Sequence, residues 1–212
     1  MKKEAIILLN MGGPNNLEEV EVFLTNMFND KNILTMKSSL LRSFIAKMIT
    51  MFRTEKAQEV YKQIGGKSPI VGHTQNLVDK LQAKVGDMTI VDFAMRYTPP
   101  FASHVIEKLN KESVEKIYLI PLYPQFSTTT TKSSLEDFEE QYHLRGGDAV
   151  LVEIKHFFEN RNYNTAVVER IKERIGNGEC KNFDLIFSAH GLPQKIVDRG
   201  DVYEKHVNKH VK

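Results

Sequence analysis

The residues best suited to chemistry in this chain surround His190, in the run Ser188-Ala189-His190-Gly191-Leu192-Pro193. The apolar run 183–187 before it has the length and composition of a buried strand, and glycine and proline are residues that end strands. His190 is therefore predicted at the carboxyl end of a strand, the edge where open α/β sheets bind ligands. An imidazole there can exchange a proton near neutral pH or bind a metal ion. A histidine at a strand end is also a common packing residue.

Strand-like and helix-like segments alternate along the chain. The runs predicted as strands are 4–10, 88–95, 116–121, 149–155 and 183–189. The segments predicted as helices are a first one from the Asn15-Asn16 cap to Phe28, then 55–64, 71–85, 101–111, 131–142 and 162–176. This alternation predicts an α/β fold in which helices cover both faces of a parallel sheet.

Turn-forming and polar residues follow the predicted strands. They occupy 10–14, 96–100 and 121–128, and the His190 turn is the fourth such place. In a parallel sheet these turns share one edge, which would gather glycines, an arginine, tyrosines, hydroxyls and a histidine. The Gly12-Gly13-Pro14 turn is not a dinucleotide-binding pattern and no P-loop occurs, so the sequence does not support a nucleotide cofactor.

Composition narrows the class of protein. The 212 residues are 41% hydrophobic and 26% charged, as in an ordinary globular protein. The net charge of +2, from 29 basic and 27 acidic residues, gives no argument for nucleic acid as a partner. The one cysteine, Cys180, cannot form an internal disulfide, which fits a cytoplasmic location. No run approaches the roughly 20 apolar residues that span a bilayer.

Segment 33–53 differs from its surroundings. It is strongly apolar and rich in methionine, and Arg42, Lys47 and Arg53 interrupt it. One interpretation is an amphipathic helix that faces the core. The other is an exposed apolar flap that contacts a hydrophobic ligand or a membrane surface, for which methionine is well suited.

Five motifs, in order and covering nearly the whole chain, resemble those of the ferrochelatase family. They are Leu8–Pro14; Tyr61–Ile70, which contains Ile-Gly-Gly-x-Ser-Pro; Met95-Arg96-Tyr97 with Pro100; Pro121–Ser127 with Thr130 and Ser133–Leu135; and Phe187–Pro193 followed by Arg199-Gly200-Asp201-Val202-Tyr203. The resemblance implies two Rossmann-like, chelatase-type lobes with parallel sheets flanked by helices, which face each other across a porphyrin cleft. It places the first lobe at 1–145, with the lip at 33–53, and the start of an incomplete second lobe at 146–212.

The resemblance also implies an activity. A ferrochelatase inserts ferrous iron into protoporphyrin IX, the last step of haem biosynthesis, with Fe(II) as a substrate and no cofactor required. The expected location is the cytoplasm, with peripheral contact to the inner face of the membrane through 33–53. Two alternatives remain open: a porphyrin- or haem-binding module without turnover, and a chelatase for another tetrapyrrole and metal, such as cobalt into sirohydrochlorin.

Site residues follow from the same motifs. His190 would be the catalytic residue, either as the base that removes a pyrrole proton or as a ligand of the incoming metal. Arg96 and Ser68 would meet the porphyrin propionates. The other substrate-binding positions are Met11, Tyr61, Tyr97 and Tyr123. Tyr61 could instead belong to the core, Arg96 could pair with a structural carboxylate, and Met11 could fill a gap.

One feature of the family pattern is missing. Family members are longer, and no His-x-Glu motif that would supply an acidic partner for His190 occurs in this sequence. The sequence therefore predicts that the second lobe is incomplete. Two other clusters are predicted as solvated helix faces: His206 with His210, in place of a zinc site, and the carboxylates of 136–140.

Overall fold

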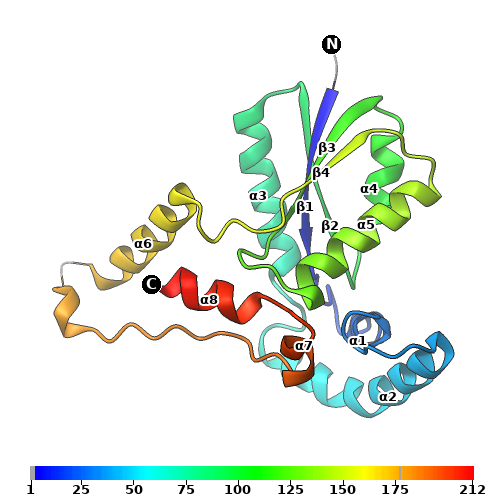
Figure 1. The fold of residues 1–212 in the computed structure, drawn as a ribbon, viewed down its shortest axis with the longest axis horizontal. Coiled ribbons are helices and arrows are strands. Elements are labelled where there is room, and N and C mark those ends of the chain that lie inside the picture. The colour runs from blue at the N-terminus through cyan, green and yellow to red at the C-terminus, as the bar shows by residue number, and fades with distance from the viewer. Residues whose placement is uncertain (1–2, 177) are drawn as a thin grey trace. The chain divides into compact units, whose positions relative to one another are not determined.

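The computed structural model describes residues 3–176 and 178–212 (Figure 1). Two compact units make up the chain. The first contains Met1–Leu122 and Thr128–Ile154, and the second contains Tyr123–Ser127 and Lys155–Lys212. The sequence-based division at 145 falls just before the last strand of the first unit, which the contacts assign to that unit.

A four-stranded parallel sheet forms the centre of the first unit. Its strands are β1 (Lys3–Asn10), β2 (Thr89–Met95), β3 (Val114–Pro121) and β4 (Val150–Glu153), in the order β2-β1-β3-β4. All three pairings are parallel, with Leu8 of β1 opposite Phe93 of β2 and Ile120 of β3. These strands confirm the first four predicted from the sequence.

Alternating residues of β1 face two different cores. Ala5, Ile7 and Leu9 lie in one core with the helices α4 (Ala102–Leu109) and α5 (Ser133–Leu144). Leu8 lies in the other with α3 (Ile70–Val85). Because side chains alternate along a strand, β1 is apolar on both faces and must be covered on both. The predicted covering of both faces by helices is confirmed (Figure 1).

Helix α1 (Glu19–Asn29) and helix α2 (Ser39–Gln63) pack against each other and form a third apolar cluster. Helix α2 joins the second half of segment 33–53 and the predicted helix 55–64 into one element of 25 residues. The Ser38 side chain caps it by accepting a hydrogen bond from the Leu41 N–H. A short π-helix, η1 (Thr128–Lys132), leads into α5.

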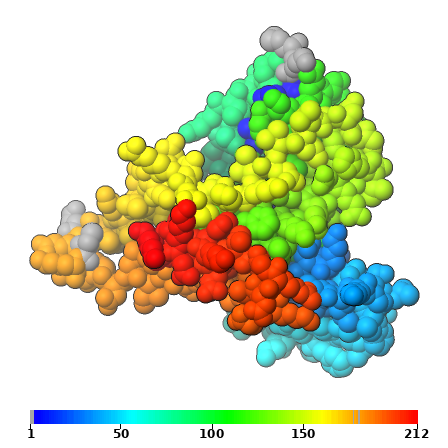
Figure 2. Space-filling model, viewed as in Figure 1, coloured from blue at the N-terminus to red at the C-terminus, as the bar shows by residue number. Residues whose placement is uncertain are grey.

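The amino-terminal half of α2 presents apolar side chains to solvent. Leu40 is 84% exposed and Phe44 63% exposed, and Met51 and Phe52 are also exposed. Figure 2 shows the α1–α2 pair, in blue and cyan, at the surface. The prediction of an exposed apolar segment is therefore confirmed. Within the described residues, no helix has both the length and the apolar character that crossing a membrane requires.

The second unit contains helices α6 (Arg161–Ile175), α7 (Gln194–Asp198) and α8 (Tyr203–Val211), and the short 3-10 helix η2 (Cys180–Asn182). The predicted strand at 183–189 is wrong: the described segment is irregular, and Ile186 is 86% exposed. A strand needs a neighbour for its backbone N–H and C=O groups. Nothing in the described part of this unit pairs with the segment, so the structure shows one α/β lobe.

Candidate functional site

Three strand-end turns meet at the carboxyl edge of the sheet. The Arg96 N–H donates to the Asn10 carbonyl (2.8 Å), and the Tyr97 N–H donates to the Met11 carbonyl (3.0 Å). The Leu122 N–H donates to the carbonyl of Leu9 (2.7 Å). The predicted gathering of the first three turns at one edge is confirmed. The fourth turn, at His190, is not part of this sheet.

The glycine turn after β1 lies so close to neighbouring side chains that Gly12 and Gly13 have no room for a Cβ atom. A Cβ on Gly12 would lie 2.4 Å from Thr98 Oγ1, and one on Gly13 would lie 2.6 Å from the Ser68 side chain. Gly12 also has a φ of +83°, which favours glycine. The Ser68 N–H donates to the Pro14 carbonyl at 2.8 Å. The Ser68 turn therefore lies directly on the glycine turn, so two of the five motifs are in contact.

Tyr61 lies near the carboxyl end of α2 and is half-buried. Like Met11, it packs against the α1–α2 cluster. Burial raises the pKa of Tyr61, so its hydroxyl stays neutral and can donate. Its carbonyl accepts the Gly66 N–H at 2.8 Å, which closes the helix into the turn that leads to Ser68. Tyr61, Met11 and Ser68 are thus brought to the same edge of the first unit.

Arg96 and Tyr97 are bound by protein groups. The Tyr97 hydroxyl donates to Asp30 Oδ2 at 2.8 Å, and Tyr97 itself is buried. The Arg96 guanidinium lies 3.5 Å from Asp30 Oδ2 and 3.2 Å from Asp137 Oδ1. Pairing of Arg96 with structural carboxylates, which the sequence left open, is therefore observed. Whether these residues also contact substrate stays a prediction.

The Asp30 carboxylate is the centre of this network. It terminates α1 and is fully buried. The Ser133 hydroxyl, at the start of α5, donates to Asp30 Oδ2, and the Asn32 N–H donates to Oδ1 at 2.7 Å. The Arg96 Nε–H in turn donates to the Ser133 hydroxyl at 3.0 Å. One carboxylate therefore joins α1, the turn after β2 and α5.

The pKa values of two acid–base groups in this network, Tyr97 and Asp137, are both raised. Burial, and then the negative charge of Asp30, raises the pKa of Tyr97 far above that of a free tyrosine. Burial also raises the pKa of Asp137, while the Arg96 guanidinium opposes this shift. Asp137 was predicted to lie on a solvated face; only 22% of its side chain is exposed, because it turns inward to Arg96.

Two hollows open at or near the carboxyl edge of the first unit. One, of about 350 Å³, is lined mainly by apolar side chains; its lining residues are Asn10, Pro69, Ile70, His73, Thr74, Leu77 and Leu122. The other, of about 250 Å³, is more polar and is lined by Asn26, Arg96, Phe101, Ala102, Ser103, Asp137 and Gln141. The first is the better match for part of an apolar ligand, because it has the fewer polar groups.

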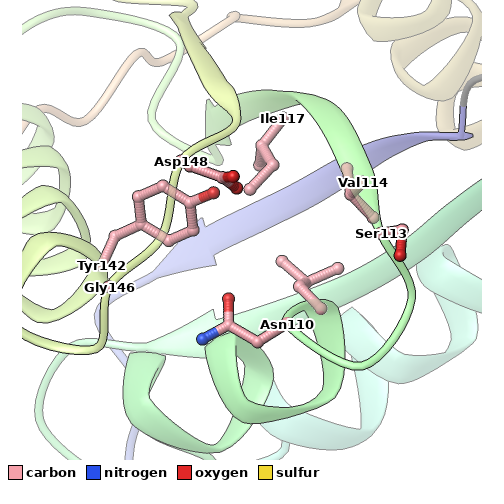
Figure 3. Close-up of a pocket in the computed structure, with 8 residues that line it drawn as sticks. Asn110, Ser113, Val114, Ile117, Tyr142, Gly146 and Asp148 are labelled. Atoms are coloured by element: carbon pink, nitrogen blue, oxygen red, sulfur yellow. The ribbon is translucent and has the colours of Figure 1, made fainter.

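A third hollow, of about 280 Å³, lies at the opposite end of the sheet, where β3 begins (Figure 3). Asn110, Ser113 and Asp148 surround it, and the Tyr142 ring closes one side. The Tyr142 hydroxyl accepts the Ala149 N–H at 2.8 Å and so fixes the loop before β4. Because ligands of open α/β sheets bind at the carboxyl edge, this hollow is not a candidate for the main site.

His190 and Tyr123 belong to the second unit. His190 is exposed and follows an irregular segment, so its predicted position at a strand end is wrong in the described structure. The physical reason is the missing strand neighbour. Its catalytic role stays a prediction. Tyr123 is half-buried in the segment 123–127. Within the described residues, no cluster of three or more histidine, cysteine or acidic side chains could hold a metal ion.

The Arg-Gly-Asp-x-Tyr motif has a structural role in the second unit. Asp201 is buried and accepts the Ser127 hydroxyl at 2.9 Å and the Tyr203 N–H at 2.9 Å. It therefore ties the segment after Tyr123 to the start of α8.

The two histidines of α8 are packed and hydrogen-bonded, so the prediction of a solvated face is wrong for them. His206 Nδ1 accepts the Phe126 N–H at 3.2 Å, and its ring lies 4.5 Å from that of buried Phe158. His210 bonds to Asn164 at 3.0 Å. Burial, and then the neighbouring charge of His156, lowers the pKa of His206. The imidazoles face inward because they cover Phe158.

The sequence profile of one protein family matches residues 3–212, and that family is the ferrochelatases. The chain belongs to the ferrochelatase family. It is 75% identical to the ferrochelatase of Sulfurimonas denitrificans over 211 residues, which are 100% of this chain and 67% of that protein. It is 53% identical to the Nitratiruptor sp. ferrochelatase (99% and 67% of the two chains) and 48% identical to that of Wolinella succinogenes (99% and 66%). It thus spans about two thirds of the length of these relatives.

Family membership confirms the resemblance that the five motifs indicated, and it places the chain among lyases of haem biosynthesis. Asp30, Ser133 and Thr98 are not among the site residues expected from the sequence, although Ser133 lies in the fourth motif and Thr98 within the third. No local pattern could have identified Asp30, since it lies 67 residues before Tyr97 and 103 before Ser133. Only the fold brings the end of α1, the turn after β2 and the start of α5 together.

Proposed function

We propose that this chain forms the porphyrin-binding part of a ferrochelatase that inserts ferrous iron into protoporphyrin IX, the last step of haem biosynthesis. The observation that supports it most is the 75% identity with a ferrochelatase over the length of the chain. The geometry agrees, because the turns that carry three of the motifs form one continuous edge in the first unit. We also propose that the activity is cytoplasmic, with peripheral contact to the inner face of the membrane through the exposed apolar part of α2.

In this proposal the first unit provides one wall of the porphyrin site. Met11 and Tyr61 offer apolar surface to the macrocycle. The substrate contact expected for Tyr123, in the second unit, stays a prediction. Ser68 supplies a hydroxyl and the end of a glycine turn for a propionate. Arg96 and Tyr97 border the same turn, but their polar groups are bound by Asp30, so they support the wall instead of binding the propionates.

The chemistry assigned to His190 follows from the substrate. Two pyrrole N–H protons must leave the macrocycle as Fe(II) enters. A neutral imidazole accepts such a proton readily, and its lone pair can alternatively contact the metal. In either role a neutral nitrogen is needed, so protonation of His190 should inhibit insertion. Exposure of His190 in the described structure is compatible with a group that meets substrate and not core.

The exposed apolar part of α2 is assigned to substrate entry. Leu40, Phe44, Met51 and Phe52 form a surface that an apolar macrocycle or a lipid headgroup region can cover. Helix α2 also carries Tyr61 at its other end. A porphyrin that arrives from the membrane would therefore meet the same helix at the surface and at the site.

The test compares two proteins: the 212-residue chain, and this chain extended by the C-terminal third of the Sulfurimonas denitrificans ferrochelatase. Porphyrin binding is followed by fluorescence quenching, and insertion by loss of the porphyrin spectrum with Fe(II) under anaerobic conditions. We expect both proteins to bind protoporphyrin IX and the extended one to insert iron. Binding without insertion by the extended chain would favour a binding module, and turnover of sirohydrochlorin with cobalt but not of protoporphyrin would favour the other chelatase.

A further inference from the structure

We propose that Asp30 and Arg96 form a buried, charged brace that positions the turn after β2 against α5, so that Arg96 is a positioning residue and not a ligand of a porphyrin propionate. This inference rests on the proposed function. It assigns a role to Asp30, which no sequence motif marks, and it changes the role expected for Arg96.

The buried carboxylate of Asp30 is held entirely by protein groups. Its side chain has 0% exposure, and its two oxygens accept hydrogen bonds from Tyr97, Ser133 and the Asn32 N–H. The Arg96 guanidinium lies 3.5 Å from the same Oδ2. A buried carboxylate is costly unless it is paired and hydrogen-bonded, and here every partner belongs to the protein. The site is therefore complete without a ligand.

All three guanidinium nitrogens of Arg96 face protein groups. One terminal nitrogen faces Asp30, the other lies 3.2 Å from Asp137 Oδ1, and Nε–H donates to Ser133 at 3.0 Å. One guanidinium thus faces two carboxylates, and the local formal charge is negative. A propionate would add a further negative charge to this set and would meet net repulsion. The planar guanidinium instead links Asp30 at the end of α1 to Ser133 and Asp137 of α5.

What the brace holds is the backbone beside Met11. The Tyr97 N–H donates to the Met11 carbonyl at 3.0 Å, and the Arg96 N–H donates to the Asn10 carbonyl at 2.8 Å. The Tyr97 ring is also part of the apolar cluster that contains Met11 and Tyr61. Releasing the brace frees this turn and shifts both side chains that would contact the macrocycle. The expected consequence is weaker binding of any porphyrin, whatever its carboxylates.

The experiment measures dissociation constants of protoporphyrin IX and its dimethyl ester by fluorescence quenching, for the 212-residue chain and its variants. The variants are Asp30→Asn, Arg96→Met, Arg96→Lys and the double variant Asp30→Asn/Arg96→Met. Glu139→Gln is the matched control, because Glu139 is a carboxylate on the same helix α5 that is half-exposed and pairs with His143 instead of Arg96.

We expect Asp30→Asn and Arg96→Met to weaken binding of the acid and of the ester by the same factor, about five- to tenfold. Arg96→Lys should not restore binding, because one ammonium cannot replace the fork between Asp30 and Ser133. The double variant should bind no more weakly than Arg96→Met, since its Asp30→Asn change removes the carboxylate charge that Arg96→Met alone leaves unpaired. Glu139→Gln should stay within about twofold of the parent, because it removes only an exposed pair with His143.

Steady-state kinetics of the extended chain distinguish a positioning role of the brace from an effect on folding alone. A brace that positions Met11 raises KM for porphyrin and leaves kcat and KM for iron within about twofold. A variant that merely lowers the amount of folded enzyme lowers kcat at unchanged KM, and that result would overturn the proposal. So would loss of acid binding with unchanged ester binding in Arg96→Met, or multiplying losses in the double variant.

Failure of the two proposals is distinguishable. If the unmodified chain and its extended form bind no porphyrin, the proposed function falls and the positioning role falls with it. If they bind porphyrin and every brace variant binds it equally well, only the brace is wrong.

Discussion

The hydroxyl of Tyr97 donates a 2.8 Å hydrogen bond to the carboxylate of Asp30, which lies 67 residues earlier in the chain. Both side chains are buried. A tyrosinate at this place would face a carboxylate without solvent, so Tyr97 remains protonated at pH values where exposed tyrosines ionise. This one bond ties the end of α1 to the edge that carries the proposed site.

The Tyr97–Asp30 bond should make the protein sensitive to alkali. The pKa of Tyr97 is raised on folding, so its contribution to stability is complete below about pH 10, the ordinary range of tyrosine, and is lost as the pH rises further. In Tyr97→Phe, this pH-dependent loss should be smaller, and stability at pH 7 should fall by about 1.5–3 kcal/mol. Urea unfolding at several pH values measures both effects. Tyr118→Phe, which alters a hydroxyl 3.4 Å from Glu4, is the control.

The contact between Gly13 and Ser68 should tolerate no side chain. In Gly13→Ala, the new Cβ would lie 2.6 Å from Ser68, and we expect a loss of about 1–3 kcal/mol in the free energy of unfolding. Gly72→Ala in α3 is the matched control. A Cβ there has no neighbour within 4 Å, so the change should raise stability by about 0.5–1 kcal/mol. Equal stability of the two variants would contradict the close approach.

The packing of His206 should weaken in acid. Burial lowers its pKa, so the neutral form is favoured in the folded state; its contribution to stability is present above about pH 6.5 and is lost as the pH falls toward the lowered pKa. Protonation also removes the acceptor of the Phe126 N–H. The protection factor of the Phe126 amide, its exchange rate relative to that of an unstructured peptide at the same pH, should fall below about pH 6. His206→Asn keeps an acceptor that does not titrate, so the protection factor in this variant should depend less on pH.

The exposed face of α2 should bind apolar surfaces. Replacing Leu40 and Phe44 by serine should reduce binding to anionic liposomes by about tenfold, because two largely exposed apolar side chains are removed. Leu144→Ser is the control, since Leu144 is equally apolar and 71% exposed but lies at the end of α5. Liposome co-sedimentation measures the effect. An equal loss in Leu144→Ser would show that general hydrophobicity, and not α2, is responsible.

His190→Ala in the extended chain should retain porphyrin binding and lose iron insertion. The expected loss in kcat is about 100-fold or more, the usual contribution of a positioned acid–base group. His143→Ala provides the control, because His143 is an exposed histidine on α5 that lines neither hollow at the carboxyl edge. Near-normal turnover in His190→Ala would remove His190 from the chemistry and leave the porphyrin-binding wall intact.

Much of the first unit could be predicted from the sequence. The apolar runs of β1–β4, the periodicity of α1, and the turns after β1 and β2 are local signals, and the structure confirms them. The predicted Asn15-Asn16 cap lies ahead of the observed helix start at Glu19, whose N–H donates to the Asn16 side chain at 2.9 Å. The exposed apolar surface at the start of α2 is one of two interpretations that its methionine-rich run with interspersed basic residues allows, and the other, packing against a core, holds for Ala46 and Ile49. Local patterns specify local structure.

The remaining features depend on partners that are distant in sequence. Residues 183–187 have the composition of a strand, yet a strand exists only with a neighbour, and the described part of the second unit supplies none. His206 was predicted to face solvent because the sequence does not show that α8 packs against Phe158, whose ring lies 4.5 Å from that of His206. Asp30 carries no signal, because its importance comes from residues 67 and 103 positions away.

Helix α2 connects the exposed apolar surface to the glycine turn. Its 25 residues correspond to about 37 Å of continuous helix. Leu40 and Phe44 lie on its amino-terminal half, which packs on α1, whereas Tyr61 lies near its other end, and beyond it Ser68 lies on Gly13. The helix has no internal proline or glycine at which it could kink. A ligand or membrane that displaces the α1–α2 pair should therefore also displace the residues around the glycine turn.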